Sequence, residues 1–97
     1  MHKNADITFQ NNQFILTGDL NFSNAMSVYE KSLQQLTQCT DLDFNFSQLQ
    51  SSDSSGLALV IEWVNLAKRY NKPIRFTLSQ DLMSIAKAAG IDKLFTA

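Results

Sequence analysis

Apolar and polar residues alternate along several short stretches of this sequence, and a period of two is typical of strands that bury one face. Between the first two stretches, Asn11 and Asn12 tolerate positive φ and predict a tight hairpin turn. Gly18 and Asp19 are expected to end the second strand, because both residue types favour turns. The predicted strands cover residues 7–9, 14–17, 42–46 and 74–78.

Three further stretches carry apolar residues at helical spacing. Asn21, Ser23 and Asn24 are candidate N-caps for the first helix, since their side chains accept hydrogen bonds from free backbone N–H groups. The third helix is expected to stop at Gly90, a residue type suited to a helix C-terminus. The first helix has its apolar stripe at Met26, Tyr29, Leu33 and Leu36, the second covers about 55–70, and the third covers about 81–89.

These elements predict an α/β fold with one domain over residues 1–97 and a mixed, largely parallel sheet of four or five strands. Helices between successive strands favour parallel pairing with right-handed crossovers. Strands buried on both faces would read as continuous apolar runs, whereas stretches 42–46 and 74–78 alternate. The helices are therefore expected mainly on one face of the sheet. The other face is expected to carry Asp43, Asn45, Arg75 and Thr77.

The second predicted helix is more apolar than packing on a sheet requires. Its two neighbouring apolar stripes together span an arc of roughly 220°, whereas a surface helix needs roughly 100°. One stripe, which would seat the helix on the sheet, comprises Leu57, Val60, Ile61, Val64 and Ala67. The second stripe comprises Leu59, Trp63, Leu66 and Tyr70.

The second stripe has two interpretations: neighbouring helices cover it as part of the core, or a partner protein covers it. Trp63 and Tyr70 favour a partner, because large aromatic side chains with a polar group are typical of interfaces. We expect both residues to anchor a partner, with Leu59 between them and the preceding loop.

Net charge and composition exclude several classes of protein. Eight basic residues against nine acidic ones argue against electrostatic binding to nucleic acid. The nearest basic cluster, Lys68, Arg69, Lys72 and Arg75, is interpreted as a solvated helix end and turn. The single cysteine excludes an intramolecular disulfide. We expect a cytoplasmic protein, because the polar N-terminus is unlike a signal peptide and no apolar run approaches the roughly 18–20 residues of a membrane span.

The segment Asp53-Ser54-Ser55-Gly56 joins a predicted strand to the second helix. Hydroxyls and free backbone N–H groups meet there at the positive end of the helix dipole. Asp53 or Ser54 is expected to cap the first turn. Beyond capping, the loop could hold a phosphorylatable Ser54, bind an anion or nucleotide, or offer a polar contact to a partner, and the loop alone leaves these functions open.

Catalysis finds little support among the residues. His2 is the one histidine and lies in the N-terminal tail, so a Ser-His-acid arrangement has no base. Cys39 has no histidine partner and is interpreted as a core residue. The aspartates lack metal-ligand spacing, and three glycines make no phosphate-binding loop. We expect a protein that is not an enzyme and that needs no metal or cofactor.

The run Asp53-Ser54-Ser55-Gly56-Leu57 after a strand resembles the signature of STAS domains, which occur in anti-sigma-factor antagonists and in transporter-associated modules. Gly18-Asp19-Leu20 resembles the family's segment after its second strand, and residues 86–95 resemble its closing helix. The resemblance extends over nearly the whole chain and implies the STAS fold.

Within that family, residues 56–63 and 66–69 are most similar to MlaB-type members. These are cytoplasmic accessory subunits of the bacterial phospholipid-transporting ABC complex that maintains outer-membrane lipid asymmetry. The resemblance implies binding to an MlaF-like ATPase subunit through the Ser54 loop and helix 57–70, and association with the inner-membrane face through that partner. The alternative is an anti-sigma-factor antagonist, switched by phosphorylation of Ser54 and partnered by a kinase-type anti-sigma factor. The second apolar stripe favours the transporter subunit.

Overall fold

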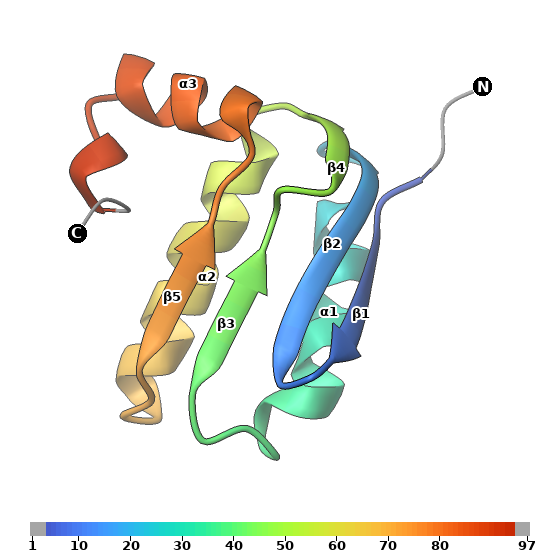
Figure 1. The fold of residues 1–97 in the computed structure, drawn as a ribbon, viewed down its shortest axis with the longest axis vertical. Coiled ribbons are helices and arrows are strands. Elements are labelled where there is room, and N and C mark those ends of the chain that lie inside the picture. The colour runs from blue at the N-terminus through green and yellow to red at the C-terminus, as the bar shows by residue number, and fades with distance from the viewer. Residues whose placement is uncertain (1–3, 95–97) are drawn as a thin grey trace.

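The computed structural model describes residues 4–94 as an α/β fold (Figure 1). Residues with positive φ form two turns where the sequence predicts them. Asn11 at φ 53° and Asn12 at φ 61° close the first hairpin, and Gly90 at φ 77° follows the last helix. The elements are β1 (Asp6–Gln10), β2 (Gln13–Leu20), α1 (Ala25–Leu36), β3 (Leu42–Asn45), β4 (Leu49–Ser52), α2 (Ser55–Arg69), β5 (Ile74–Thr77), α3 (Gln80–Ala88) and the 3-10 helix η1 (Asp92–Leu94).

The five strands form one mixed sheet in the order β1-β2-β3-β5, with β4 also paired to β2. Only β1 runs antiparallel to its neighbour; β3 and β4 pair with β2 in parallel, and β5 pairs with β3 in parallel. Figure 1 shows β5 and β1 at opposite edges. The predicted largely parallel sheet of four or five strands is therefore confirmed. The second helix is expected to begin at about residue 55, and α2 begins at Ser55.

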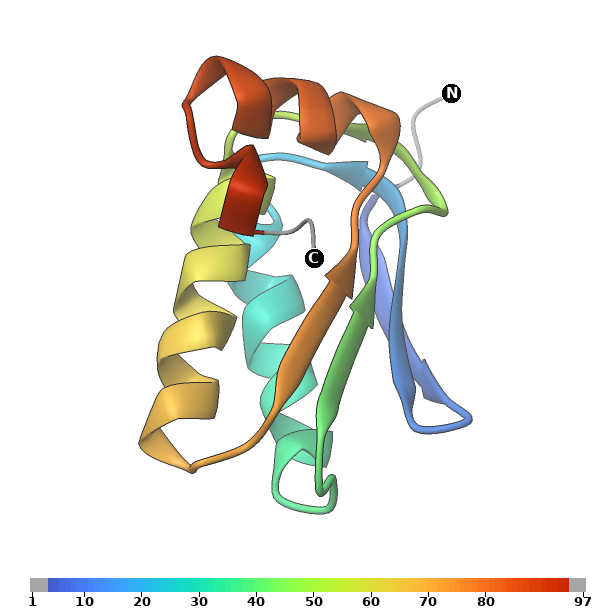
Figure 2. The ribbon, with the colours of Figure 1, turned by 60° about the vertical axis from the view of Figure 1, so that its left-hand side comes forward.

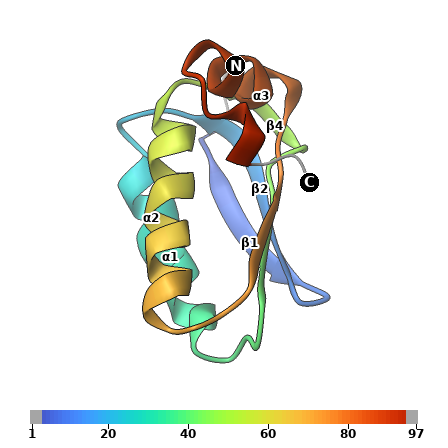
Figure 3. The same ribbon diagram turned by 90° about the vertical axis from the view of Figure 1, so that its left-hand side faces the viewer.

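Helices α1 and α2 lie side by side on one face of the sheet, as the edge-on view in Figure 3 and the turned view in Figure 2 both show. The helix-facing side chains of β3 are fully buried at Leu42 and Phe44. On the opposite face, Arg75 Nε lies 3.2 Å from Asp43 Oδ2. The prediction that helices lie mainly on one face of the sheet is confirmed. Helix α3 packs across the end of the sheet (Figure 1).

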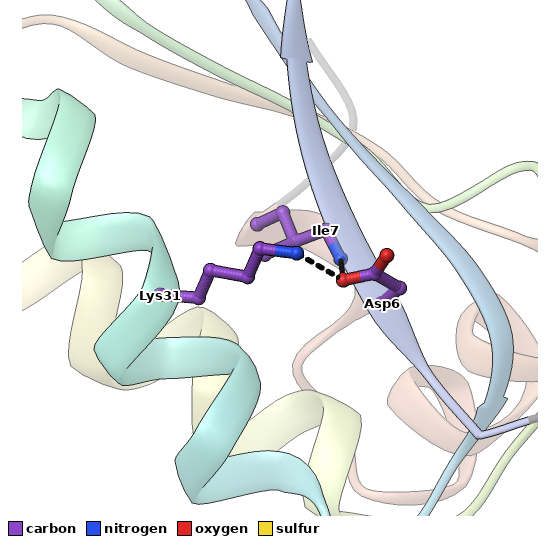
Figure 4. Close-up of polar contacts among 3 residues, drawn as sticks. All are labelled: Asp6, Ile7 and Lys31. Carbon is purple, nitrogen blue, oxygen red and sulfur yellow. Dashed lines mark hydrogen bonds and ion pairs between the residues drawn. The ribbon is translucent and has the colours of Figure 1, made fainter.

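The edge strand β1 is tied to α1 by an ion pair (Figure 4). Lys31 Nζ lies 2.6 Å from Asp6 Oδ1, the same oxygen that accepts from the backbone N–H of Ile7 at 2.8 Å. Both charged side chains are about half exposed, so the pair contributes less than about 1 kcal/mol to stability. The pair joins α1 to the strand that carries the buried Ile7.

The sequence predicts that the second strand ends at Gly18 and Asp19. In the structure β2 continues through both residues to Leu20. Gly18 adopts φ 85°, and the pairing of β2 with β4 shifts register between Gly18 and Asp19. Glycine allows this irregularity without the steric penalty that a side chain would bring. The turn-forming residues therefore bend the strand without ending it.

Strand β4 is an element that the sequence does not predict, because Gln50, Ser51 and Ser52 show no apolar alternation. It forms because the chain turns tightly after β3 and resumes beside β2. Asn45 Oδ1 accepts hydrogen bonds from the backbone N–H of Ser47 at 2.9 Å and from its hydroxyl at 2.6 Å. Ser51 and Ser52 thus belong to the sheet, and the loop before α2 is shortened to Asp53 and Ser54.

Candidate functional site

The loop before α2 is held by the side chain of Asp53. Its Oδ1 accepts from the backbone N–H of Ser55 at 2.8 Å and also from the Ser55 hydroxyl. The Asp53 backbone N–H donates to Leu20 O at 3.3 Å, which ties the loop to the end of β2. The expected capping is therefore done by Asp53, while Ser54 makes no side-chain cap bond. Ser54 is exposed, so its hydroxyl faces solvent at the N-terminus of α2.

Ser55 and Gly56, predicted as partner-binding residues, are buried. A Cβ added to Gly56 would lie 2.7 Å from Leu82 Cδ2 and 2.6 Å from Ser52 Oγ. Gly56 therefore allows α3 to pack closely on the first turn of α2, and Ser55 serves the hydrogen bonding of Asp53. Gly56 has no side chain to offer and is packed against α3, so the prediction that it contacts a partner directly is wrong. Ser55 is buried but borders a surface groove, and its partner contact stays a prediction.

Trp63 is fully buried, with 0% of its surface exposed, so the prediction that it anchors a partner is also wrong. Its ring stacks on Phe44 with centroids 4.0 Å apart and meets Phe46 edge-on at 5.9 Å. The indole N–H donates to Ser32 Oγ of α1 at 3.0 Å, which satisfies the polar group that favoured an interface. The Trp63 side chain of α2 therefore contacts both α1 and the sheet.

The remaining members of the second stripe separate along α2. Leu59 and Leu66 are buried, and only Tyr70, at 60% exposure, presents a large surface. Ser54 and Tyr70 flank the helix α2, so at about 1.5 Å per residue Tyr70 lies about 24 Å along the axis from Ser54. Ser54 and Tyr70 therefore lie at opposite ends of α2.

Helix α1 is rotated relative to the stripe that the sequence predicts. Its buried residues are Val28, Ser32 and Leu36, while Met26 is 65% exposed and Leu33 is 41% exposed. Ser32 takes a core position because its hydroxyl both accepts from Trp63 and donates to Tyr29 O at 2.6 Å. The rotation moves two apolar side chains from the core to the surface beside α2.

An apolar groove of about 290 Å³ lies between the N-terminal halves of α1 and α2, next to the Ser54 loop. We call it the loop-end groove. Phe22 at 74% exposure and Met26 form its outer wall, and Leu59 contributes to its floor. Its full lining is Phe22, Ala25, Met26, Tyr29, Ser55, Ala58, Leu59 and Glu62.

Phe22 is the site residue that the sequence reasoning missed. It lies in the turn between β2 and α1, where Asn21 Oδ1 accepts from the Ser23 backbone N–H at 3.0 Å and Asn24 Nδ2 donates to Asp19 O at 2.8 Å. These bonds fix the turn and leave the Phe22 ring outside. No periodic signal marks Phe22, because it lies in the turn before α1 and outside the helical repeat.

The buried thiol of Cys39 offers no reactive group. Burial raises the pKa of the thiol, with a smaller lowering by Lys72 and a smaller raising by Asp41. Its Sγ donates to Gln35 O at 3.2 Å, consistent with a protonated thiol in the core as the sequence predicts. Among residues 4–94 no three His, Cys, Asp or Glu side chains gather as metal ligands. His2 lies outside the described residues.

Comparison with known proteins decides the family. The family model described as "Mlab, STAS domain" matches residues 4–96. The chain belongs to the MlaB-type STAS domain family. No curated protein matches its sequence.

A solved structure similar to this STAS domain is that of the anti-sigma factor antagonist SpoIIAA in its unphosphorylated form. The match has a TM-score of 0.71 and 16% sequence identity, and covers 96% of this chain and 86% of the other. At that identity the likeness shows the fold. STAS domains are generally regulatory or accessory domains that contact partner proteins. In the described part of this chain, no helix is long and apolar enough to cross a membrane.

Proposed function

We propose that this STAS domain is the accessory subunit of a phospholipid-transporting ABC complex and docks on its ATPase subunit through the loop-end groove and the adjacent Ser54. Membership of the MlaB-type family is the observation that carries the proposal. The proposed role is binding and positioning of the ATPase, without catalysis by this chain.

The shape and chemistry of the loop end support a protein contact there. Phe22 and Met26 expose apolar surface in a groove next to the loop that carries the exposed Ser54. Interfaces commonly combine such an apolar centre with a polar rim, and a few large side chains carry most of the binding energy. Asp53 lies beside Ser54 and Glu62 lines the groove, so the contact also offers two carboxylates. Of the residues predicted from the sequence, Asp53, Ser54, Ser55 and Leu59 stay in the proposed site.

Titration calorimetry with the purified ATPase subunit tests this site. Phe22→Ser and Met26→Ser each remove exposed apolar surface and should leave the fold intact. We expect each to raise the Kd by about thirtyfold, which corresponds to about 2 kcal/mol. Leu33→Ser is the matched control, since Leu33 is also an exposed apolar residue of α1 but lies at the other end. If Phe22→Ser binds the ATPase with unchanged affinity and Leu33→Ser binds it more weakly, the ATPase contact lies outside the loop-end groove.

A second candidate function is a signalling switch in which a kinase-type anti-sigma factor phosphorylates Ser54. The exposed Ser54 hydroxyl without a side-chain cap bond favours it. A phosphate there would meet the favourable helix dipole but also the adjacent Asp53 carboxylate. The complex isolated from the native cell separates the two functions: an ATPase bound to the unmodified chain supports the transporter subunit, whereas a kinase and an added mass of about 80 Da at Ser54 support the switch.

A further inference from the structure

A second groove lies at the opposite end of the same two helices. It has a volume of about 320 Å³ and runs between the C-terminal halves of α1 and α2; we call it the helix-end groove. Tyr29 lines both grooves, so the helix-end groove begins where the loop-end groove stops. Its lining is Tyr29, Leu33, Leu36, Thr37, Leu42, Leu66, Arg69, Tyr70 and Lys72.

The floor of the helix-end groove is apolar and its rim is exposed. Leu36, Leu42 and Leu66 are buried beneath it, whereas Leu33 and Tyr70 retain large exposed surfaces on its two sides. An apolar side chain entering between Leu33 and Leu66 would bury apolar surface of both walls of the groove, which is favourable because that surface leaves water.

The charge of the lining is one-sided, with two cations, Arg69 and Lys72, and no carboxylate. Lys72 Nζ donates to Leu36 O at 2.6 Å, which holds this cation at the end of α1. Lys68 is exposed on the last turn of α2 next to Arg69. Within residues 4–94, no ion pair joins Lys68, Arg69 or Lys72 to an acidic side chain. A ligand that fits the groove is therefore expected to carry negative charge.

We propose that the helix-end groove binds an acidic, amphipathic segment of a partner protein. One or two apolar side chains of the segment fill the groove between Leu33 and Leu66, while its carboxylates pair with Arg69 and Lys72. A peptide segment fits an open groove better than an acyl chain does, because the segment turns a polar side to water and an acyl chain would remain partly exposed. Arg69 lies about 21 Å along α2 from its start, at the other end of the helix from the proposed ATPase contact.

A library of displayed random peptides, each about twelve residues long, provides the probe, because a helix of that length spans about 18 Å. Peptides selected on the wild-type chain are tested against Arg69→Glu and Leu33→Asp, with Phe22→Ser as the control from the other groove. We expect the selected peptides to combine Asp or Glu with large apolar residues, and to bind Arg69→Glu and Leu33→Asp at least about tenfold more weakly, through lost pairing and a charge placed in the apolar contact.

Three results would overturn the proposal: no selected peptide that depends on Arg69, selected peptides without acidic residues, or Arg69-dependent flotation with phosphatidylglycerol vesicles in place of peptide binding. Circular dichroism melting of each variant confirms folding. Calorimetry with the ATPase subunit on the same variants separates this proposal from the proposed function. Arg69→Glu should bind the ATPase normally, and Phe22→Ser should bind the selected peptides normally.

Discussion

The indole of Trp63 and the hydroxyl of Ser32 show how single residues decide which surfaces are free. Trp63 stacks on Phe44 and donates to Ser32, so α1, α2 and the sheet meet at one side chain. From the sequence, Ser32 is one polar residue on a helix face and gives no sign that it is buried. Its hydrogen bond depends on a tryptophan 31 positions away. The pattern of apolar and polar positions along the sequence could therefore not show whether Trp63 lies in the core or at an interface.

At the residue scale we predict opposite behaviour for Trp63 and Tyr70. Trp63→Ala should lower the free energy of unfolding by about 3–5 kcal/mol, because it leaves a cavity among stacked aromatic rings. Tyr70→Ala, on an exposed side chain, should change it by less than about 1 kcal/mol. Thermal melting checks both variants, with a drop of more than about 12 °C expected for Trp63→Ala. Equal melting temperatures for the two variants would contradict the assignment of Trp63 to the core.

At the scale of elements, the sequence patterns predict the hairpin, the helix starts and the covered face well, because these depend on local chemistry. Alternation in β3 and β5 is enough to show that one sheet face lacks a helix. The failures depend on distant contacts. Strand β4 forms by pairing with β2, and the inward-facing Ser32 of α1 accepts its hydrogen bond from Trp63 of α2.

The junction of α2 with α3 gives the prediction at this scale. Alanine in place of a helical glycine normally stabilises by up to about 1 kcal/mol. Gly56→Ala should instead destabilise by about 1–3 kcal/mol, because its Cβ would overlap the buried Leu82 side chain. In a Leu82→Ala background the overlap with Leu82 is gone and only the contact with the Ser52 hydroxyl remains, so the same change should cost less. Urea unfolding of the four proteins measures this coupling. A stabilising Gly56→Ala in both backgrounds would show that the two helices do not pack this closely.

At the scale of the whole molecule, the arrangement leaves three different surfaces. The sheet face opposite the helices is mainly polar and carries the Asp43–Arg75 contact. The groove between α1 and α2 is apolar at the loop end and apolar with a basic rim at the helix end. The two proposed binding sites follow from this arrangement: the loop-end groove contacts the ATPase, and the helix-end groove is free for a second partner.

Hydrogen–deuterium exchange of the full chain, alone and bound to the ATPase subunit, tests this account most directly. Docking at the loop end should slow exchange in residues 21–26 and 54–62, because the partner excludes water from the turn before α1 and from the first turns of α2. Exchange in residues 42–45 and 74–77 should be unchanged. Slowed exchange in those two strands, with no change around Ser54 and Phe22, would contradict the account and place the partner on another surface of the sheet.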